Sequence, residues 1–455
     1  MKTRSSGATL LTEGNILKKL IGFAVPIFFG NLFQQLYNTC DSLIVGNFVG
    51  SDALAAVSSS GSLIFLMVGL FNGIAMGAGV VIARYFGARD KEMMQRAIHT
   101  TVFFGLVAGI LLTGVGIALT PLLLRWMGTP ESVLPQSILY FRVYFAGILA
   151  VVMYNIAVGI LQAVGDSRHP LYYLMVSSCV NVVLDLLFVA VLGYGVGAAA
   201  LATTIAQTLS AILAFRRLMT GTDAEYRVYP KKVRPDFSML KQILGVGLPS
   251  GLQNSIISLA NVIVQSNINA FGADAMAGCG VYFKVEGFAF LPVTCFSMAL
   301  ATFVSQNLGA NRPDRAKKGA IYGTLCSMAV AELIGILFYT LCPYIMSAFN
   351  RDPDVLSFGV SQAHTEALFY FLLAFSHCMA GILRGAGHAK VPMLVMLVCW
   401  CIIRITYITV TVALIPDIRV VFWAYPITWT LSGISFITYM SRGTWLKPPK
   451  NTFDS

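Results

Sequence analysis

The sequence has few charged residues and few histidines. Only 11% of its 455 residues are Asp, Glu, Lys or Arg, and 5 are His, whereas soluble domains carry about a quarter charged residues. No GxxxxGK[ST] phosphate loop, HExxH zinc motif or GxSxG nucleophile motif occurs. Direct use of ATP and the common hydrolytic active sites are therefore not indicated. We expect no enzyme activity, no catalytic residue and no cofactor.

Paired cysteines and a signal peptide are also missing. The nine cysteines form no CxxC pair, are odd in number, and fall in or beside apolar stretches. We interpret them as small apolar packing residues and not as a disulfide framework or a metal site. The N-terminal segment MKTRSSGATLLTEGN lacks the apolar core and small-residue cleavage site of a signal peptide. The first hydrophobic segment is therefore expected to remain as a helix.

Hydrophobic residues make up 57% of the chain, and the mean hydropathy is +0.75. Apolar stretches recur that are long enough to cross about 30 Å of hydrocarbon as helices. They predict an all-α polytopic membrane protein with twelve spans. The predicted spans are 16–46, 53–86, 94–124, 132–163, 169–191, 196–215, 240–271, 275–308, 316–345, 354–383, 391–415 and 421–440.

The basic residues predict the orientation of these spans. The net charge is +11, which could suggest nucleic acid. However, 25 of the 31 Lys and Arg residues fall in segments that are cytoplasmic if the N-terminus is inside, or within the span ends next to them. This positive-inside bias predicts an even number of spans, with both termini cytoplasmic. The charge is thus a topology signal, and we expect the lipid bilayer as surroundings and no nucleic acid as a partner.

The two halves of the sequence repeat each other. LKKLIGFAVP from Leu17 matches LKQILGVGLP from Leu240, and GILQAVGDSRHP from Gly159 matches GILRGAGHAKVP from Gly381, at an almost constant spacing. This repeat predicts two parallel six-helix bundles, at 1–215 and 240–455, joined by a cytoplasmic linker at 216–239. Such parallel repeats are typical of transporters, in which one bundle moves against the other.

Several motifs together carry a family resemblance. They are Pro26 followed by Asp41, FVGSDALAA from Phe48, the GARD and VSQNLGAN segments, and the paired GILxxxGxxxxP ends. In this order and in both halves they resemble the multidrug and toxic compound extrusion (MATE) family. The resemblance implies two six-helix bundles around a central cleft. It also implies secondary active export of organic cations or amphipathic compounds, driven by inward flow of Na⁺ or H⁺.

Polar residues inside predicted spans are costly in hydrocarbon and are usually functional. In the first half these are Asp41, Asn181, Asp185 and Thr203. Asn181 and Asp185 are four residues apart and share a helix face. Together the four offer carboxylate, amide and hydroxyl oxygens, which suit Na⁺, and two carboxylates that could equally take up H⁺. By resemblance, these four positions match the family's cation-coupling residues.

Further polar residues are expected to line a substrate cleft. Pro26 would permit a kink in the first span, because a proline frees a backbone carbonyl. By resemblance, this helix bends when the acid site changes occupancy, although a passive kink is an equal alternative. Tyr140 and Asn155 match family positions that line the first-bundle cavity. The predicted cleft residues of the first half are Pro26, Gln34, Tyr37, Asn38, Tyr140 and Asn155.

The second half does not repeat the acids. Asp41 falls opposite Val264, and Asp185 falls opposite Tyr407. Glu286 on the eighth span is the second half's candidate cleft residue, with Lys284 two positions before it. Glu286 could bind a cationic substrate or pair with a neighbouring base, and both interpretations remain open. The glycines Gly69, Gly73 and Gly77 are expected to serve helix packing.

Two other functions fit this sequence less well. A flippase for a lipid-linked or polyprenyl precursor belongs to a related superfamily, but it would need a strongly cationic cavity. A non-transporting scaffold or receptor would need an extramembrane ligand domain, and the loops are short. We therefore expect a monomer in the cell membrane that takes small drug-like substrates. Neither the substrate nor the choice between Na⁺ and H⁺ follows from the sequence.

Overall fold

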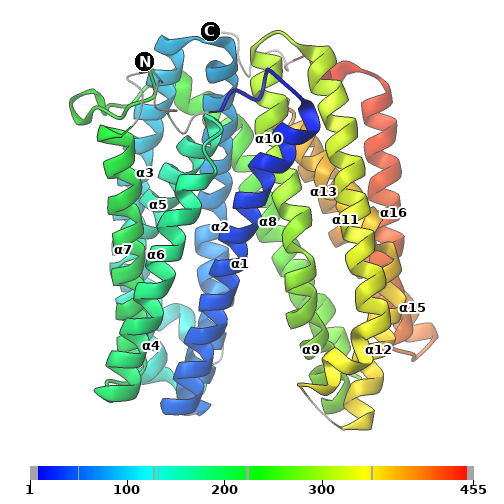
Figure 1. The fold of residues 1–455 in the computed structure, drawn as a ribbon. Coiled ribbons are helices and arrows are strands. Elements are labelled where there is room, and N and C mark those ends of the chain that lie inside the picture. Colours follow the sequence, from blue (N-terminus) through cyan, green and yellow to red (C-terminus); the bar gives the residue numbers. More distant parts are fainter. Residues whose placement is uncertain are drawn as a thin grey trace. The chain divides into compact units, whose positions relative to one another are not determined.

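The computed structural model describes residues 9–49, 51–126, 129–131, 133–221, 225–349 and 352–447, with the backbone alone for 51–68. The side chains of the FVGSDALAA motif after Val49 therefore lie outside the described residues. The described elements are all helices, joined by short loops (Figure 1). This is the expected outcome for apolar stretches, because a helix satisfies its own backbone hydrogen bonds where no water is available.

Eleven helices or continuous runs of helical elements in the described part of the chain are long and apolar enough to cross a membrane. One further pair, α4 and α5, is bent by 47° and brings the number to twelve if it counts as one span. The prediction of an all-α membrane protein with twelve spans is thus confirmed. Large apolar side chains such as Ile110 and Val183 are 60% and 62% exposed, as expected for surfaces that face lipid.

Contacts divide the chain into two compact units. Unit 1 comprises Met1–Leu10 and Val25–Leu248, and unit 2 comprises Leu11–Ala24 and Pro249–Ser455. The boundaries therefore fall inside α1 and α8, next to the equivalent prolines Pro26 and Pro249. Each of these helices begins in one unit and continues in the other. The predicted division at 216–239 follows the repeat and remains a prediction about domains.

Unit 1 contains the larger part of α1 and the first turns of α8. α5 packs on α2, α3 and α7, and α7 also packs on α4 and α6. Its helices are α1 (Ile16–Phe48), α2 (Ser51–Ala88), α3 (Lys91–Trp126), α4 (Leu134–Ala146), α5 (Ile148–Ala163), α6 (Arg168–Asp185), the π-helix η1 (Leu186–Val191), α7 (Val196–Thr220), the short 3₁₀ turn η2 (Pro230–Lys232) and α8 (Phe237–Asn269). α7 thus extends five residues into the predicted linker, and the first three residues of α8 lie within it.

Unit 2 is built around α13, which packs on α10, α11 and α16. α9 packs on α12, and α15 packs on α16. Its helices are α9 (Ala273–Ala289), α10 (Leu291–Gly309), α11 (Pro313–Ser347), α12 (Pro353–Glu366), η3 (Ala367–Phe369), α13 (Tyr370–Gly385), α14 (Lys390–Met396), the π-helix η4 (Leu397–Ile403), α15 (Arg404–Leu414), α16 (Arg419–Ser441) and η5 (Thr444–Leu446).

The repeat is visible in the backbone. Arg89 and Asn311, which are equivalent positions after α2 and α10, both have positive φ angles of 59° and 54°. Gly165 and Gly387 are a second equivalent pair, with φ angles of 82° and 90°. Non-glycine residues seldom adopt such angles, so the shared conformation shows that both halves use the same turns.

Close helix packing depends on small residues. A Cβ atom on Gly77 of α2 would lie 2.4 Å from the backbone nitrogen of Gly247 in α8, within unit 1. A Cβ atom on Gly147, at the bend between α4 and α5, would lie 2.3 Å from Cγ2 of Thr204 on α7. These approaches leave no room for a larger side chain. The packing role predicted for Gly77 is therefore seen directly.

The segment before α1 is held by side chains of unit 2. The buried Leu11 donates its backbone N–H to Oε1 of Gln306 over 2.9 Å, and Asn307 and Arg315 donate to its carbonyl oxygen. Within unit 1, the backbone N–H of Thr9 donates to the carbonyl of Val164 over 3.1 Å. Gln306 and Asn307 of the VSQNLGAN motif thus bind the buried backbone groups of Leu11.

Candidate functional site

The four predicted cation-coupling residues lie in unit 1 on three helices. α1 carries Asp41, α6 carries Asn181 and Asp185, and α7 carries Thr203. Asp41 is 8% exposed, Asn181 1% and Asp185 0%. Asn181 donates a hydrogen bond from Nδ2 to Oγ1 of Thr203 over 3.4 Å, which joins α6 to α7. Asp41 and Asp185 are close enough to interact electrostatically.

Most of the oxygens in this group lack a partner. Oδ1 of Asp41, Oδ1 of Asn181 and both carboxylate oxygens of Asp185 are buried without a hydrogen bond in the described part of the chain. A buried carboxylate is costly unless it is paired, protonated or bound to a cation. The donor set consists only of oxygens, which fits Na⁺ and also fits protons. We call Asp41, Asn181, Asp185 and Thr203 the oxygen cluster.

The surroundings of the oxygen cluster are apolar. Buried side chains of α1, α4, η1 and α7 form one hydrophobic cluster, which includes Ile44, Tyr140, Val189 and Ala199. Asp185 is the last residue of α6, and the π-helix η1 follows it directly. π-helical turns are rare and are frequent at functional sites. The two acids therefore sit in a low-dielectric environment beside an irregular helix segment.

The two predicted tyrosines lie beside the acids. Tyr37 and Tyr140 are 9% and 5% exposed, and both interact electrostatically with Asp41 and Asp185. The hydroxyl of Tyr37 accepts a hydrogen bond from Nε2 of Gln207 on α7 over 3.2 Å. Gln207 was not singled out from the sequence. It lies four residues after Thr203, so helical spacing on α7 could have revealed it.

Other predicted cleft residues lie elsewhere on unit 1. Gln34 and Asn38 are exposed, and Pro26 is half-buried inside α1. Gln34 and Asn38 are four residues apart and therefore share a face of α1.

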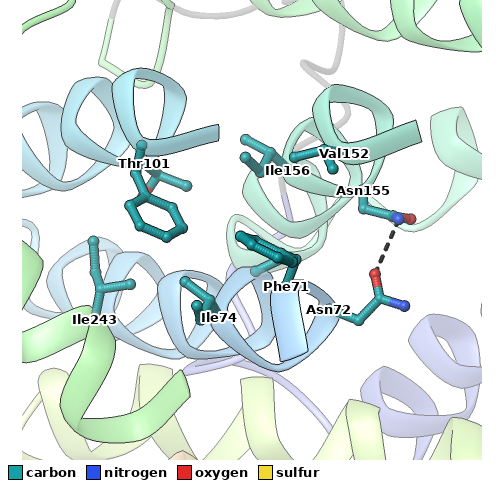
Figure 2. Close-up of a pocket in the computed structure, with 10 residues that line it drawn as sticks. Phe71, Asn72, Ile74, Thr101, Val152, Asn155, Ile156 and Ile243 are labelled. Atoms are coloured by element: carbon teal, nitrogen blue, oxygen red, sulfur yellow. Dashed lines mark hydrogen bonds between the residues drawn. The ribbon is translucent and has the colours of Figure 1, made fainter. Parts of the chain in front are cut away.

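Asn155 lines a pocket in unit 1 that is separate from the oxygen cluster. Its Nδ2 donates to Oδ1 of Asn72 over 3.0 Å, and Figure 2 shows the two amides facing each other. The pocket lies among α2, α3, α5 and the first turns of α8. The lining residues are mainly apolar and include none of the four oxygen-cluster residues. They are Phe71, Asn72, Ile74, Ala75, Thr101, Phe104, Val152, Asn155, Ile156 and Ile243.

Glu286 of unit 2 is half-buried on α9, and the hydroxyl of Tyr282 lies 3.2 Å from its Oε1. Among the described residues Glu286 forms no salt bridge, the neighbouring Lys284 is exposed, and Arg404 of α15 lies within electrostatic reach. Binding of a cationic substrate and pairing with a base both stay predictions. Tyr282 also contacts Glu366 of α12, whose part at this site the sequence did not reveal.

Comparisons with known proteins place this geometry in a family. The MatE family pattern matches residues 26–187 and 249–410. One match therefore falls in each half, and the two begin at Pro26 and Pro249. The probable multidrug resistance protein YpnP of Bacillus subtilis is 27% identical over 400 residues, which cover 86% of this chain and 88% of that protein. The probable multidrug resistance protein NorM of Thermotoga maritima is 26% identical over 413 residues, which cover 88% and 84%.

Solved structures agree in fold. A MOP superfamily transporter from Pyrococcus furiosus superposes with a TM-score of 0.91 at 22% identity, over 98% of this chain and 100% of that one. A MATE protein in its bent conformation gives a TM-score of 0.91 at 23% identity, over 98% and 99%. The matched residues cover well over half of the sequence, in both repeats. The chain is therefore a member of the MatE family of membrane transporters.

Proposed function

We propose that this protein is a secondary active exporter of organic cations or amphipathic compounds, which it exchanges for Na⁺ or H⁺ by alternating access. The observation that carries the proposal is the oxygen cluster, where both oxygens of the fully buried Asp185 lack a partner. Such a group is stable only with a cation or a proton. The multidrug names of the relatives from Bacillus subtilis and Thermotoga maritima support export of drug-like molecules.

The chemistry of the cluster supports coupling by one of two ions. Na⁺ would bind to the carboxylates of Asp41 and Asp185, the amide oxygen of Asn181 and the hydroxyl of Thr203. The amide oxygen of Asn181 is free for this, because only its Nδ2 is engaged with Thr203. Protons would instead neutralise Asp41 and Asp185 in turn, since two nearby carboxylates titrate as a coupled pair. In either case, occupancy changes the charge buried among α1, α6 and α7.

A change of charge at Asp41 acts on the helix that contains Pro26. The two residues are fifteen positions apart on α1, about four helical turns, and the boundary between the contact units lies next to Pro26. The missing hydrogen bond at a proline lowers the resistance of a helix to bending. We propose that ion occupancy at the oxygen cluster alters the bend of α1 and thereby the substrate cleft that Gln34, Tyr37 and Asn38 line.

The cellular setting is part of the same proposal. We place the protein in the cell membrane as a monomer, with both termini cytoplasmic and with small drug-like molecules as substrates. The positive-inside distribution of Lys and Arg supports this orientation.

The decisive experiment measures efflux of ethidium from vesicles while Na⁺ and H⁺ gradients are imposed separately. We expect one of the two gradients to drive export, and Asp41→Asn and Asp185→Asn to reduce export to background. Asp417→Asn is the matched control, because Asp417 lies in the loop between α15 and α16 and pairs with Arg419. Export that persists without either gradient would exclude antiport. Undiminished export by both cluster variants would exclude this coupling site.

A further inference from the structure

Unit 2 buries an arginine near the end of α13. Arg384 stands one residue after the predicted span 354–383, where a basic side chain usually extends into water. It is instead only 7% exposed. Its Nη2 donates a hydrogen bond to Oγ of Ser297 on α10 over 3.2 Å. The guanidinium therefore lies inside unit 2, where α13 packs on α10.

The side chain of Arg384 extends back along its own helix. The hydroxyl of Ser297 donates to the backbone carbonyl of His377 over 2.6 Å, and His377 precedes Arg384 by seven residues on α13. Long side chains on a helix point toward its N-terminus, and seven residues are about two turns. The positive charge is thus held away from the end of α13, where water could solvate it.

Two nitrogens at this place lack a partner. Nε of Arg384 and Nε2 of His377 are both buried without a hydrogen bond in the described part of the chain. The two side chains are within electrostatic reach of each other. A guanidinium carries five N–H donors and no acceptor, and this one donates to a single serine. A buried charge in this state is costly unless a ligand of opposite charge compensates it.

No acid compensates Arg384. Among the described residues, none of the acids forms a salt bridge with it or lies within its electrostatic reach. Arg404, the other buried arginine of unit 2 in the described ranges, differs in this respect, because Glu286 and Glu366 are both within its electrostatic reach. Arg384 is therefore the buried cation whose charge the chain leaves unbalanced.

Aromatic rings enclose the histidine. The ring centre of His377 lies 4.8 Å from that of Phe290 and 5.3 Å from that of Trp400. Nε1 of Trp400 is already engaged, because it donates to Ser432. These rings form an apolar wall, and a low-dielectric environment strengthens the attraction between a guanidinium and an anion. Free N–H donors, one cation and apolar walls together suit an anionic ligand.

The repeat shows that helix packing does not require an arginine here. Gln162 of α5 stands at the position of Arg384, within the matching segments GILQ and GILR. A Cβ atom on Gly159 would lie 3.3 Å from a backbone carbonyl oxygen of α2, and one on Gly381 would lie 2.3 Å from a backbone carbonyl oxygen of α10. Both units thus cross the equivalent helices closely, and unit 1 does so with a neutral side chain.

The equivalent place in unit 1 is a pocket. Asn155 stands at the position of His377, and it lines the pocket of Figure 2 together with Asn72. The lining of that pocket is apolar apart from the amides and one threonine, and it contains no charge. The two repeats therefore provide a neutral pocket in unit 1 and a cationic group of donors in unit 2.

We propose that Arg384, His377 and Ser297 form an anion-binding site in unit 2, which takes chloride or a carboxylate group. Arg384 supplies the positive charge and the free Nε–H, and His377 supplies a second N–H from Nε2. Ser297 positions the guanidinium, since its own hydrogen is used on the carbonyl of His377. The site differs from the oxygen cluster in unit and in charge, and it is independent of the proposed export.

The test measures the melting temperature of the purified full-length protein in detergent. Chloride or acetate replaces HEPES as the anion while the Na⁺ concentration is held constant. A ligand that binds only the folded state raises the melting temperature, so we expect a rise that saturates. A rise with chloride assigns an inorganic anion, and a rise with acetate alone assigns a carboxylate. No rise with either anion would overturn the site and leave water as its occupant.

Arg384→Gln tests the assignment to this arginine. It introduces the residue that unit 1 has at the equivalent position, so the variant should fold, and the saturable rise should be lost. Arg442→Gln is the matched control, since Arg442 is exposed at the end of α16, and it should keep the rise. A rise in Arg384→Gln equal to that of the wild type would contradict the site.

His377→Phe keeps an aromatic ring and removes the N–H. We expect about a tenfold higher half-saturating concentration, as for the loss of one hydrogen bond to a charged group. An unchanged concentration would remove His377 from the site. Bromide provides a measurement that needs no variant, because its anomalous scattering locates it in crystals. Bromide bound elsewhere and not beside Arg384 would overturn the proposal.

Discussion

The backbone N–H of Leu11 donates a hydrogen bond to the side chain of Gln306, 295 residues later in the sequence. Both groups are fully buried, and Gln306 belongs to the VSQNLGAN motif, which begins in the last turns of α10. The motif therefore has a structural role, because Gln306 and Asn307 bind backbone groups of the peptide that precedes α1.

Gln306→Ala should lower stability, because it leaves the buried N–H of Leu11 without its acceptor. An unmade buried hydrogen bond costs about 1–3 kcal/mol, so the melting temperature in detergent should fall. Gln265→Ala is the matched control, since Gln265 on α8 donates to Asn269 on the same helix, at an exposed position. Equal melting temperatures for the two variants would show that Leu11 finds another acceptor.

Gly247→Val should destabilise the packing of α8 on α2. A Cβ atom at Gly247 would lie 2.6 Å from Cα of Ile74, which is backbone and cannot move aside as a side chain could. Overpacking of this kind costs about 1–3 kcal/mol. Gly245→Val places the same side chain two residues earlier, where a Cβ atom has no neighbour within 4 Å. Detergent unfolding curves should separate the two, and similar losses would contradict the predicted close contact.

Pro26→Ala should fold normally and export more slowly, because a straight helix no longer bends in response to the oxygen cluster. We expect about a tenfold lower rate of ethidium efflux, which corresponds to about 1.4 kcal/mol in the barrier. Pro249→Ala is the matched control, because Pro249 is the equivalent residue on α8. α8 has Val264 at the position of Asp41 and therefore has no acid that could act on its bend. Export reduced equally by both substitutions would indicate a general role for proline kinks, and unchanged export by Pro26→Ala would exclude the bending role.

Asp236→Asn should lower stability at neutral pH but not in acid. Partial burial acts to raise the pKa of Asp236. This effect is outweighed by hydrogen bonds from the backbone of Met239 over 3.1 Å and from Nε of Arg96 over 2.7 Å, so the pKa is lowered. The pKa of Asp236 is lower in the folded state than in the unfolded state, where it is about 3.9. The ionised carboxylate therefore stabilises the fold at pH values above about 3.9, and this stabilisation is lost as the pH falls through the folded-state pKa.

The difference in melting temperature between the wild type and Asp236→Asn should therefore be constant from about pH 7 to pH 5 and shrink below about pH 4. We expect about 1 kcal/mol at neutral pH, since Asn retains the capping geometry and loses only the charge. A double-mutant cycle with Arg96→Gln assigns the effect to this pair. A difference that persists in acid would argue against the ionised carboxylate as its source.

The individual spans could be predicted because their signal is local. A helix that crosses hydrocarbon must be apolar over most of its length and must satisfy its own backbone. Arg89 and Asn311, which share the same left-handed turn, show that the sequence repeat also carried over to the backbone. The buried acids could be singled out for the same reason, since Asp41 and Asp185 stand out against apolar neighbours.

The partners of these residues could not be predicted, because they depend on contacts between distant helices. Gln207 hydrogen-bonds to Tyr37 from 170 residues away, and no local pattern indicates that pairing. The resemblance groups Asn155 with Tyr140 as cavity residues. In the structure Asn155 and Asn72 line a pocket to which Tyr140 does not contribute. In the sequence, Glu366 is one of several acids on the later spans. Only the packing of α12 on α9 shows that it lies beside Tyr282.

The sequence by itself thus determined an all-helical membrane protein of two repeated halves, because hydrophobic length, charge bias and proline and glycine positions are properties of single segments. Only the tertiary structure decided which oxygens remain unpaired, and that two glutamates meet at one hydroxyl. Hydrogen-bond partners follow from the packing of side chains between helices, and a one-dimensional pattern does not specify that packing.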